Sequence, residues 1–193
     1  MLVQPARRRK MKRSIRLLAK ITPIVAVVLL CFTFGCQQPV EEAITEEEAK
    51  ALLDRYLEIW NEGNLTIVEE VFDPEYVLHH CAFPEDIVGL DGFKSWTTSS
   101  LTAFPDHYLV FDEMIVKGDK VVTRWTATAT NTGTLVGPLG ELPPTGKKFR
   151  ITGIAISRVV DGKIAEEWLV YNMLDMLQQL GFTLTPPQLE EPQ

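Results

Sequence analysis

The stretch "EEWLVYNMLDMLQQLG", residues 166–181, starts with the pattern of a β-strand and ends with the pattern of a helix. Trp168 and Tyr171 are residue types that favour strands. Side chains of a strand alternate between its two faces, so Glu167 and Leu169 point the same way as Tyr171. This face therefore combines an acid, a leucine and a phenol. Whether the side chains of this face can transfer a proton distinguishes a catalyst from a binding domain.

The rest of the chain predicts helices first and strands last. Apolar spacing and helix-start signals indicate helices over 45–60, 65–72 and 89–104. Segments rich in β-branched and aromatic residues indicate strands over 108–116, 120–133, 147–160 and 163–172. Asp161–Gly162 predicts a tight hairpin between the last two strands. This order indicates an α+β fold, with N-terminal helices packed on a curved antiparallel sheet.

Residues 1–36 have the composition of an export signal, with basic residues followed by the uncharged apolar stretch 21–34. That stretch is shorter than the roughly 20 residues that span a bilayer. It ends at Gly35–Cys36, which resembles a bacterial lipobox and implies that Cys36 becomes the lipidated first residue of the mature chain. An uncleaved membrane anchor and an ordinary signal peptide are the alternatives, and Met11 is a second candidate start.

The exported part is expected to be one acidic domain, residues 46–182, between a tether at 37–45 and a disordered tail at 183–193. Without its first 36 residues, the chain has 11 basic and 26 acidic residues, a net charge near −15. Such a surface does not suit nucleic acid, because binding phosphates needs basic side chains. The domain itself holds a single cysteine, Cys81, so no disulfide forms within it.

Several motifs occur together in a characteristic order: "IWNEGN", "YVLHH", "GLDGFKSW", "LPPTGKKF" and "ITGIAISRVVDGKIAEEW". With these motifs, residues 46–182 resemble the SnoaL-like polyketide and ester cyclase family of the nuclear transport factor 2-like superfamily. The resemblance implies a cone-shaped fold around one apolar pocket, often in a homodimer formed through the sheet. It also implies ring closure without a metal or organic cofactor, with an acid residue as the base.

The chain departs from the family at the residues that carry this chemistry. Family cyclases place Asp directly after the Trp of the "EEW" motif, where this chain has Leu169. Across the hairpin, relatives often have His or Asp where this chain has Ala155. Two functions stay open: a module that binds a small apolar or carbonyl-bearing molecule, and a cofactor-free cyclase or isomerase that uses His79 or Glu167 as base.

Three residues are candidates for catalysis. Glu167 is a substitute base, displaced by one strand repeat from Leu169, or else a solvated or salt-bridged residue near the sheet edge. His79 follows "YV", where family members often carry a pocket His, or else is a structural histidine. Tyr171 is a hydroxyl donor or a packing residue.

Six residues are expected to contact the ligand, and no metal site is expected. His79, His80 and Cys81 are adjacent in an extended segment, so they face alternate sides and cannot converge on one ion. The expected partners are the small molecule, the membrane through the anchor, and a second copy of the chain. The residues expected at the ligand are Trp60, Trp125, Ala155, Ser157, Leu169 and Asn172.

Overall fold

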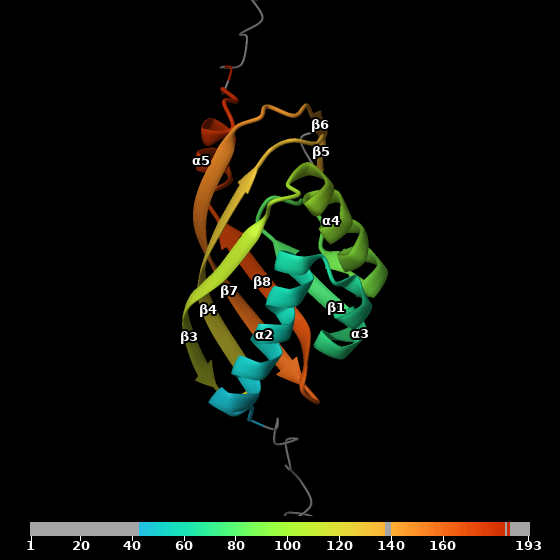
Figure 1. Cartoon of the computed structure of the whole chain (residues 1–193). Helices are drawn as coiled ribbons and strands as arrows, with labels where there is room; N and C mark the ends of the chain where they lie inside the picture. Colours follow the sequence, from blue (N-terminus) through green and yellow to red (C-terminus); the bar gives the residue numbers. More distant parts are fainter. Residues whose placement is uncertain (1–42, 138–139, 184, 186–193) are drawn as a thin grey trace, which may run out of the picture. The chain divides into compact units, whose positions relative to one another are not determined.

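The computed structural model describes residues 43–137, 140–183 and 185. The predicted export signal with Cys36, most of the predicted tether and nearly all of the predicted tail lie outside these residues. The described chain folds into a curved six-stranded sheet with helices against its inner face (Figure 1). No helix in the described part is both long and apolar enough to cross a membrane.

The sheet has the strand order β2-β1-β8-β7-β4-β3. Neighbouring strands are antiparallel except β1 and β8, which run parallel. The sheet is therefore curved and mainly antiparallel, as expected from the sequence, with one parallel pair. The strands are β1 (Phe72–His80), β2 (Ile87–Val88), β3 (Tyr108–Lys117), β4 (Lys120–Thr130), β7 (Lys148–Val160) and β8 (Lys163–Tyr171).

Strand β1 was not assigned from the sequence, because Asp73, Pro74 and Glu75 interrupt its apolar pattern. The register with β8 shifts between Phe72 and Val77, at this polar segment. Proline lacks the N–H that a sheet requires, so it is tolerated at such an irregularity. From Tyr76 onward, side chains alternate between the two faces of the strand. Tyr76, Leu78 and His80 share the buried face.

The helices bring aromatic side chains to the inner face. Helix α2 (Glu46–Glu62) begins with a capping box, in which Thr45 and Glu48 bind each other's backbone N–H. It is followed by η1 (Leu65–Ile67), α3 (Val68–Val71) and α4 (Gly89–Ala103). Trp60 of α2 packs edge-on against Trp96 of α4, with ring centroids 5.0 Å apart. These helices therefore wall in a space above the sheet.

Two small elements close one end of this space. The hairpin of β5 (Leu135–Gly137) and β6 (Gly140–Leu142) packs near α4, and α5 (Met173–Gln179) packs against β7. Both lie at the end of the fold opposite to the start of α2 (Figure 1). Asn172 begins α5, and its side chain accepts a hydrogen bond from the Asp175 backbone at 3.0 Å.

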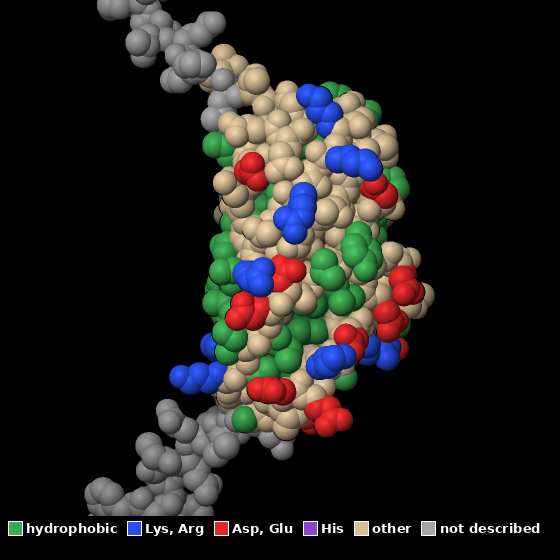
Figure 2. All heavy atoms as spheres, turned by 60° about the vertical axis from the view of Figure 1, so that its left-hand side comes forward, with side chains coloured by type: hydrophobic (Ala, Val, Ile, Leu, Met, Phe, Trp, Pro, Cys, Tyr) green, Lys and Arg blue, Asp and Glu red, His purple; other side chains and the backbone are tan. Residues whose placement is uncertain are grey.

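The outer face of the sheet is partly apolar. Ile154 and Val170 are directly paired across β7 and β8 and are 46% and 53% exposed. On the β3–β4 side, Arg124 forms ion pairs with Asp112 and Glu113. In the space-filling view of this side, hydrophobic side chains lie between basic and acidic groups (Figure 2).

Candidate functional site

A cavity of about 140 Å³ lies between the inner face of the sheet and the helices. Its walls are mainly aromatic and aliphatic, with few polar groups. The aromatic lining residues are Tyr56, Trp60, Phe83, Trp96, Phe104, Phe111, Trp125, Phe149 and Tyr171. This composition is typical of a small-molecule site.

Cross-strand pairing arranges the sheet side of the cavity in rows. In one row, Leu169 of β8 lies opposite Ala155 of β7 and His80 of β1. In the row below, Glu167 lies opposite Ser157 and Leu78. The expected common face of Glu167, Leu169 and Tyr171 is confirmed, because all three line the cavity.

The next row depends on a glycine. Gly153 lies between Trp125 and Tyr171, its partners on β4 and β8. A Cβ atom at Gly153 would lie 2.1 Å from Cζ2 of Trp125, so only glycine lets the indole lie flat on β7. Trp125 and Tyr171 then pack edge to face, with ring centroids 5.9 Å apart. This row forms a rigid aromatic wall.

Glu167 is the acid of the cavity. Its side chain is 2% exposed, and Oε2 accepts a hydrogen bond from the Tyr76 hydroxyl at 2.7 Å. Burial raises the pKa of Glu167 to about 7, although hydrogen bonds from Tyr76 and Tyr56 stabilise the carboxylate. The alternative of a solvated residue near the sheet edge is therefore wrong. The carboxyl group can take up and release a proton near neutral pH.

The histidine of the cavity is His80, so the expectation that His79 lies in the pocket is wrong. Alternation along β1 turns His80 inward, beside Leu169, and turns its neighbour outward. Burial lowers the pKa of His80 to about 4, so its imidazole is neutral near pH 7. Nδ1 accepts a hydrogen bond from the Ala82 backbone at 3.1 Å. The proton is therefore on Nε2, which makes this atom a donor.

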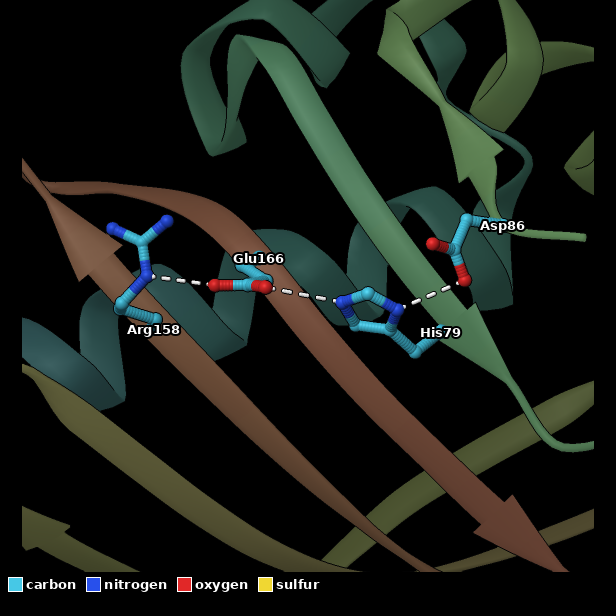
Figure 3. Close-up of polar contacts among 4 residues, drawn as sticks. All are labelled: His79, Asp86, Arg158 and Glu166. Carbon is cyan, nitrogen blue, oxygen red and sulfur yellow. Dashed lines mark hydrogen bonds and ion pairs between the residues drawn. The ribbon is translucent and has the colours of Figure 1, made fainter.

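His79 belongs to a polar network on the outer face (Figure 3). Its Nδ1 lies 2.8 Å from Asp86, and its Nε2 lies 3.0 Å from Glu166. Glu166 also accepts a hydrogen bond from Arg158 at 2.9 Å. The hydrogen bonds to Glu166 and Asp86 raise the pKa of His79, despite its partial burial. The imidazole also stacks on Trp168, with ring centroids 5.1 Å apart.

Four of the six expected ligand contacts line the cavity, namely Trp60, Trp125, Ala155 and Leu169. Two expectations are corrected. Ser157 is buried in the row of Glu167 but does not line the cavity. Asn172 is exposed, and its side chain caps α5.

The sequence pattern did not identify three residues near the site. The irregular start of β1 hides Tyr76 in the sequence, and alternation alone does not show whether His79 or His80 faces the cavity. His107 lies in the loop before β3 and lines the cavity beside Trp60, with ring centroids 5.1 Å apart. Burial lowers the pKa of His107 to about 4. Among the described residues, no three His, Cys, Asp or Glu side chains are grouped to hold a metal.

Solved structures share this fold. TsrD from Streptomyces laurentii is 27% identical, with a TM-score of 0.63, and the match covers 72% of this chain and 98% of that one. AclR from Streptomyces galilaeus, a putative hydroxylase, is 30% identical with a TM-score of 0.60, over 71% and 98% of the two chains. IdmH from Streptomyces antibioticus, a putative polyketide cyclase, is 28% identical with a TM-score of 0.58, over 69% and 98%.

A search among curated proteins found no match. The family model described as SnoaL-like polyketide cyclase matches residues 50–180, which include both walls of the cavity. The expected resemblance and the expected α+β fold are thereby confirmed. The chain belongs to the SnoaL-like polyketide cyclase family.

Proposed function

We propose that the domain is a cofactor-independent acid–base enzyme that acts at the carbon next to a carbonyl group, with Glu167 as its base. One observation carries the proposal. A carboxyl group that is 2% exposed lies in the wall of an apolar cavity and accepts a hydrogen bond from Tyr76 at 2.7 Å. Burying a carboxylate without a cation costs folding free energy. Buried acids with shifted pKa values are therefore typical of functional sites.

The environment of Glu167 supports this role. A general base is most effective when its pKa lies near the working pH. Desolvation brings the pKa of Glu167 to about 7, whereas an exposed glutamate is fully ionised at that pH and is a weaker base. The Tyr76 hydroxyl fixes one carboxyl oxygen and so orients the other.

His80 supplies the complementary group. In the proposed step, the Glu167 carboxylate removes a proton from the α-carbon, and the electron pair moves to the carbonyl oxygen. The resulting enolate accepts a hydrogen bond from Nε2–H of His80. In a substrate with a C=C bond next to the α-carbon, the enolate extends over that bond. The protonated Glu167 then returns the proton to the far carbon of that bond, which completes an isomerisation that moves the double bond. In a ring closure, the enolate carbon attacks a second carbonyl group, and Glu167 protonates the new alkoxide.

The position of Glu167 relates this chemistry to the family pattern. In our proposal, Leu169 occupies the place of the family's catalytic Asp, and Glu167 lies on the same face one strand repeat away. The base is then about 7 Å further along the strand. The same row as Leu169 contains His80, so a polar group is still present beside the vacated position.

A second candidate function is binding without catalysis. It is favoured by the paired apolar residues Leu169 and Ala155, because neither can transfer a proton. In this case the cavity holds a small apolar or carbonyl-bearing molecule, and Glu167 only anchors it.

Deuterium exchange distinguishes the two candidates without knowledge of the natural substrate. We expect the full chain in D2O to accelerate exchange of the α-protons of 2-nonanone, followed by NMR. The rate rises as pH increases through about 7, because the base must be ionised. Exchange no faster than in buffer with heat-denatured protein would refute the enzyme and leave the binding module.

We further propose that the protein is exported and held at the membrane through a lipid on Cys36. The basic segment, the apolar stretch 21–34 and Gly35–Cys36 support this proposal. Cys36→Ser is expected to give a soluble exported protein. If this variant instead behaves as an integral membrane protein, the segment is an uncleaved anchor.

We also propose a homodimer through the outer face of the sheet. Ile154 and Val170, paired and half exposed, support it, since burial of such a face is favourable. Val170→Asp is expected to give monomers in sedimentation velocity. Val88→Asp, at a residue that is 63% exposed on edge strand β2, is the matched control and leaves the dimer intact. Monomers in the unsubstituted protein would refute the proposal.

A further inference from the structure

The cavity is closed at one end. Glu167 is the last lining residue of β8 in that direction. The next inward pair, Val159 and Ile164, is 5% and 0% exposed and belongs to the core. On the helix side, Tyr56 lines the cavity, whereas Leu53 is core. Glu167 therefore lies at the floor.

The other end opens between the β5–β6 hairpin and α5. Val136 of the hairpin lines the cavity and is 55% exposed, and Gly140 is also exposed. Across from them, α5 contributes Met173, Met176 and Leu177. This mouth is formed almost entirely by carbon atoms, and methionine side chains adapt to ligands of different shape.

Polar groups are distributed unevenly along this axis. Glu167 at the floor is the one Asp, Glu, Lys or Arg among the lining residues of the described chain, and His80 lies in the next row. Away from the floor, the polar atoms of the lining are uncharged near pH 7. They belong to Ser100, His107, the Tyr171 hydroxyl and the indole N–H groups of Trp60 and Trp125. The carboxyl group and the inner histidine therefore lie at one end of the cavity, and a ligand that complements the cavity has its most polar group at that end.

The cavity is also narrow. Between the row of Glu167 and Phe149, β7 extends over residues 157–149, roughly 25 Å of strand. The enclosed volume is only about 140 Å³. An engineered cavity of about 150 Å³ holds one benzene molecule. This small volume, in a cavity that follows β7 over this length, favours a slender ligand over a bulky one.

We infer that the site takes an unbranched apolar chain that carries a carbonyl group at or next to its end. The chain enters with the carbonyl first. Its oxygen reaches the row of His80 and Glu167, and the tail passes between α5 and the β5–β6 hairpin. This inference rests on the proposed function, because it names the substrate class of the same site.

Two isomeric ketones test the direction of binding, by titration calorimetry with the full chain. In 2-nonanone the carbonyl lies next to the chain end, and in 5-nonanone it lies in the centre. The closed floor cannot accept the second arm of 5-nonanone, so its oxygen stays without a partner. We expect 2-nonanone to bind about tenfold more tightly. A difference below threefold, including no binding of either ketone, overturns the inference.

Chain length and a floor variant separate this result from the proposed function. Two further methylenes in the apolar mouth are expected to make 2-nonanone about tenfold tighter than 2-heptanone. Equal affinities would overturn the inference. Glu167→Gln is expected to bind 2-nonanone within threefold of the unsubstituted chain while losing exchange. Intact exchange in that variant refutes the base but leaves the carbonyl-first inference in place.

Discussion

Two neighbouring strands, β1 and β8, carry the same two residue types on opposite faces of the sheet. On the outer face, His79 and Glu166 bind each other at 3.0 Å, with both side chains partly exposed. On the inner face, His80 and Glu167 lie in adjacent rows of the cavity. The two side chains of the outer pair are hydrogen-bonded to each other and partly solvated, whereas those of the inner pair are buried.

The pKa values of the two pairs shift in opposite directions. The pKa of His79 is raised and that of Glu166 is lowered, mainly by their mutual hydrogen bond. Burial lowers the pKa of His80 to about 4 and raises that of Glu167 to about 7. The side of the strand, and not the residue type, therefore sets the direction of each pKa shift.

The largest expected effect comes from the two glutamates. Glu167→Gln keeps the shape of the side chain but removes the base, so α-proton exchange of 2-nonanone falls about 10³-fold. Glu166→Gln is the matched control on the outer face and changes the rate less than twofold. Similar losses of exchange rate in both variants, measured by NMR, would show that the contribution of a glutamate to exchange does not depend on which face of the sheet it lies on.

Stability should respond to pH through Glu167. Its pKa is about 7 in the folded protein, against an ordinary value of 4.5 for a glutamate in water, so the folded protein binds the proton more tightly than the unfolded chain. The carboxyl group therefore destabilises the fold progressively as pH rises from about 4.5 through about 7, by on the order of 3 kcal/mol in total.

Urea unfolding of the unsubstituted chain and Glu167→Gln at pH 4.5 and pH 8.5 measures this effect. We expect the variant to gain stability relative to the unsubstituted chain at the higher pH. A difference that does not change with pH would mean that Glu167 is not desolvated.

The two histidines give the next effect. His80→Phe keeps an aromatic ring in the cavity but removes the N–H donor, and exchange is expected to fall about 100-fold. His79→Phe removes the outer contacts and leaves the rate within twofold. If His79→Phe is the slower variant, the assignment of inner and outer histidine is incorrect.

The smallest effect is expected in the outer network. Partly exposed ion pairs contribute less than about 1 kcal/mol. Because the folded pKa of His79 is raised, its contribution is present below pH 6.5 and is lost as pH rises through that pKa. Thermal unfolding of His79→Gln should thus approach that of the unsubstituted chain at high pH. A deficit that grows with pH would contradict this sign.

The sequence predicted the helices, the strand meander and the common face of Glu167, Leu169 and Tyr171. Local periodicity determines these features, and the hairpin at Asp161–Gly162 makes β7 and β8 neighbours. The sequence also predicted that Ala155 lies opposite Leu169. The structure has this pair, after a register shift between Arg158 and Val159 that the hairpin alone does not determine.

Sequence reasoning failed at β1, where no local signal sets the register. β1 pairs with a strand about 90 residues away, so only the folded chain shows which of His79 and His80 faces Leu169. The sequence pattern also does not show how deeply a side chain is buried. The sequence left Glu167 either as a substitute base or as a solvated or salt-bridged residue, because its burial depends on Tyr56 and Tyr76, which reach it from two other elements.

The most direct test of the central claim is the pKa of Glu167 itself. Carbon-13 NMR of the glutamate carboxyl groups, with Glu167→Gln to assign the signal, follows its titration without any substrate. A midpoint near 7 is the predicted result. A midpoint at or below 4.5 would mean that the carboxyl group is solvated and ionised, and would contradict its role as the base of the cavity.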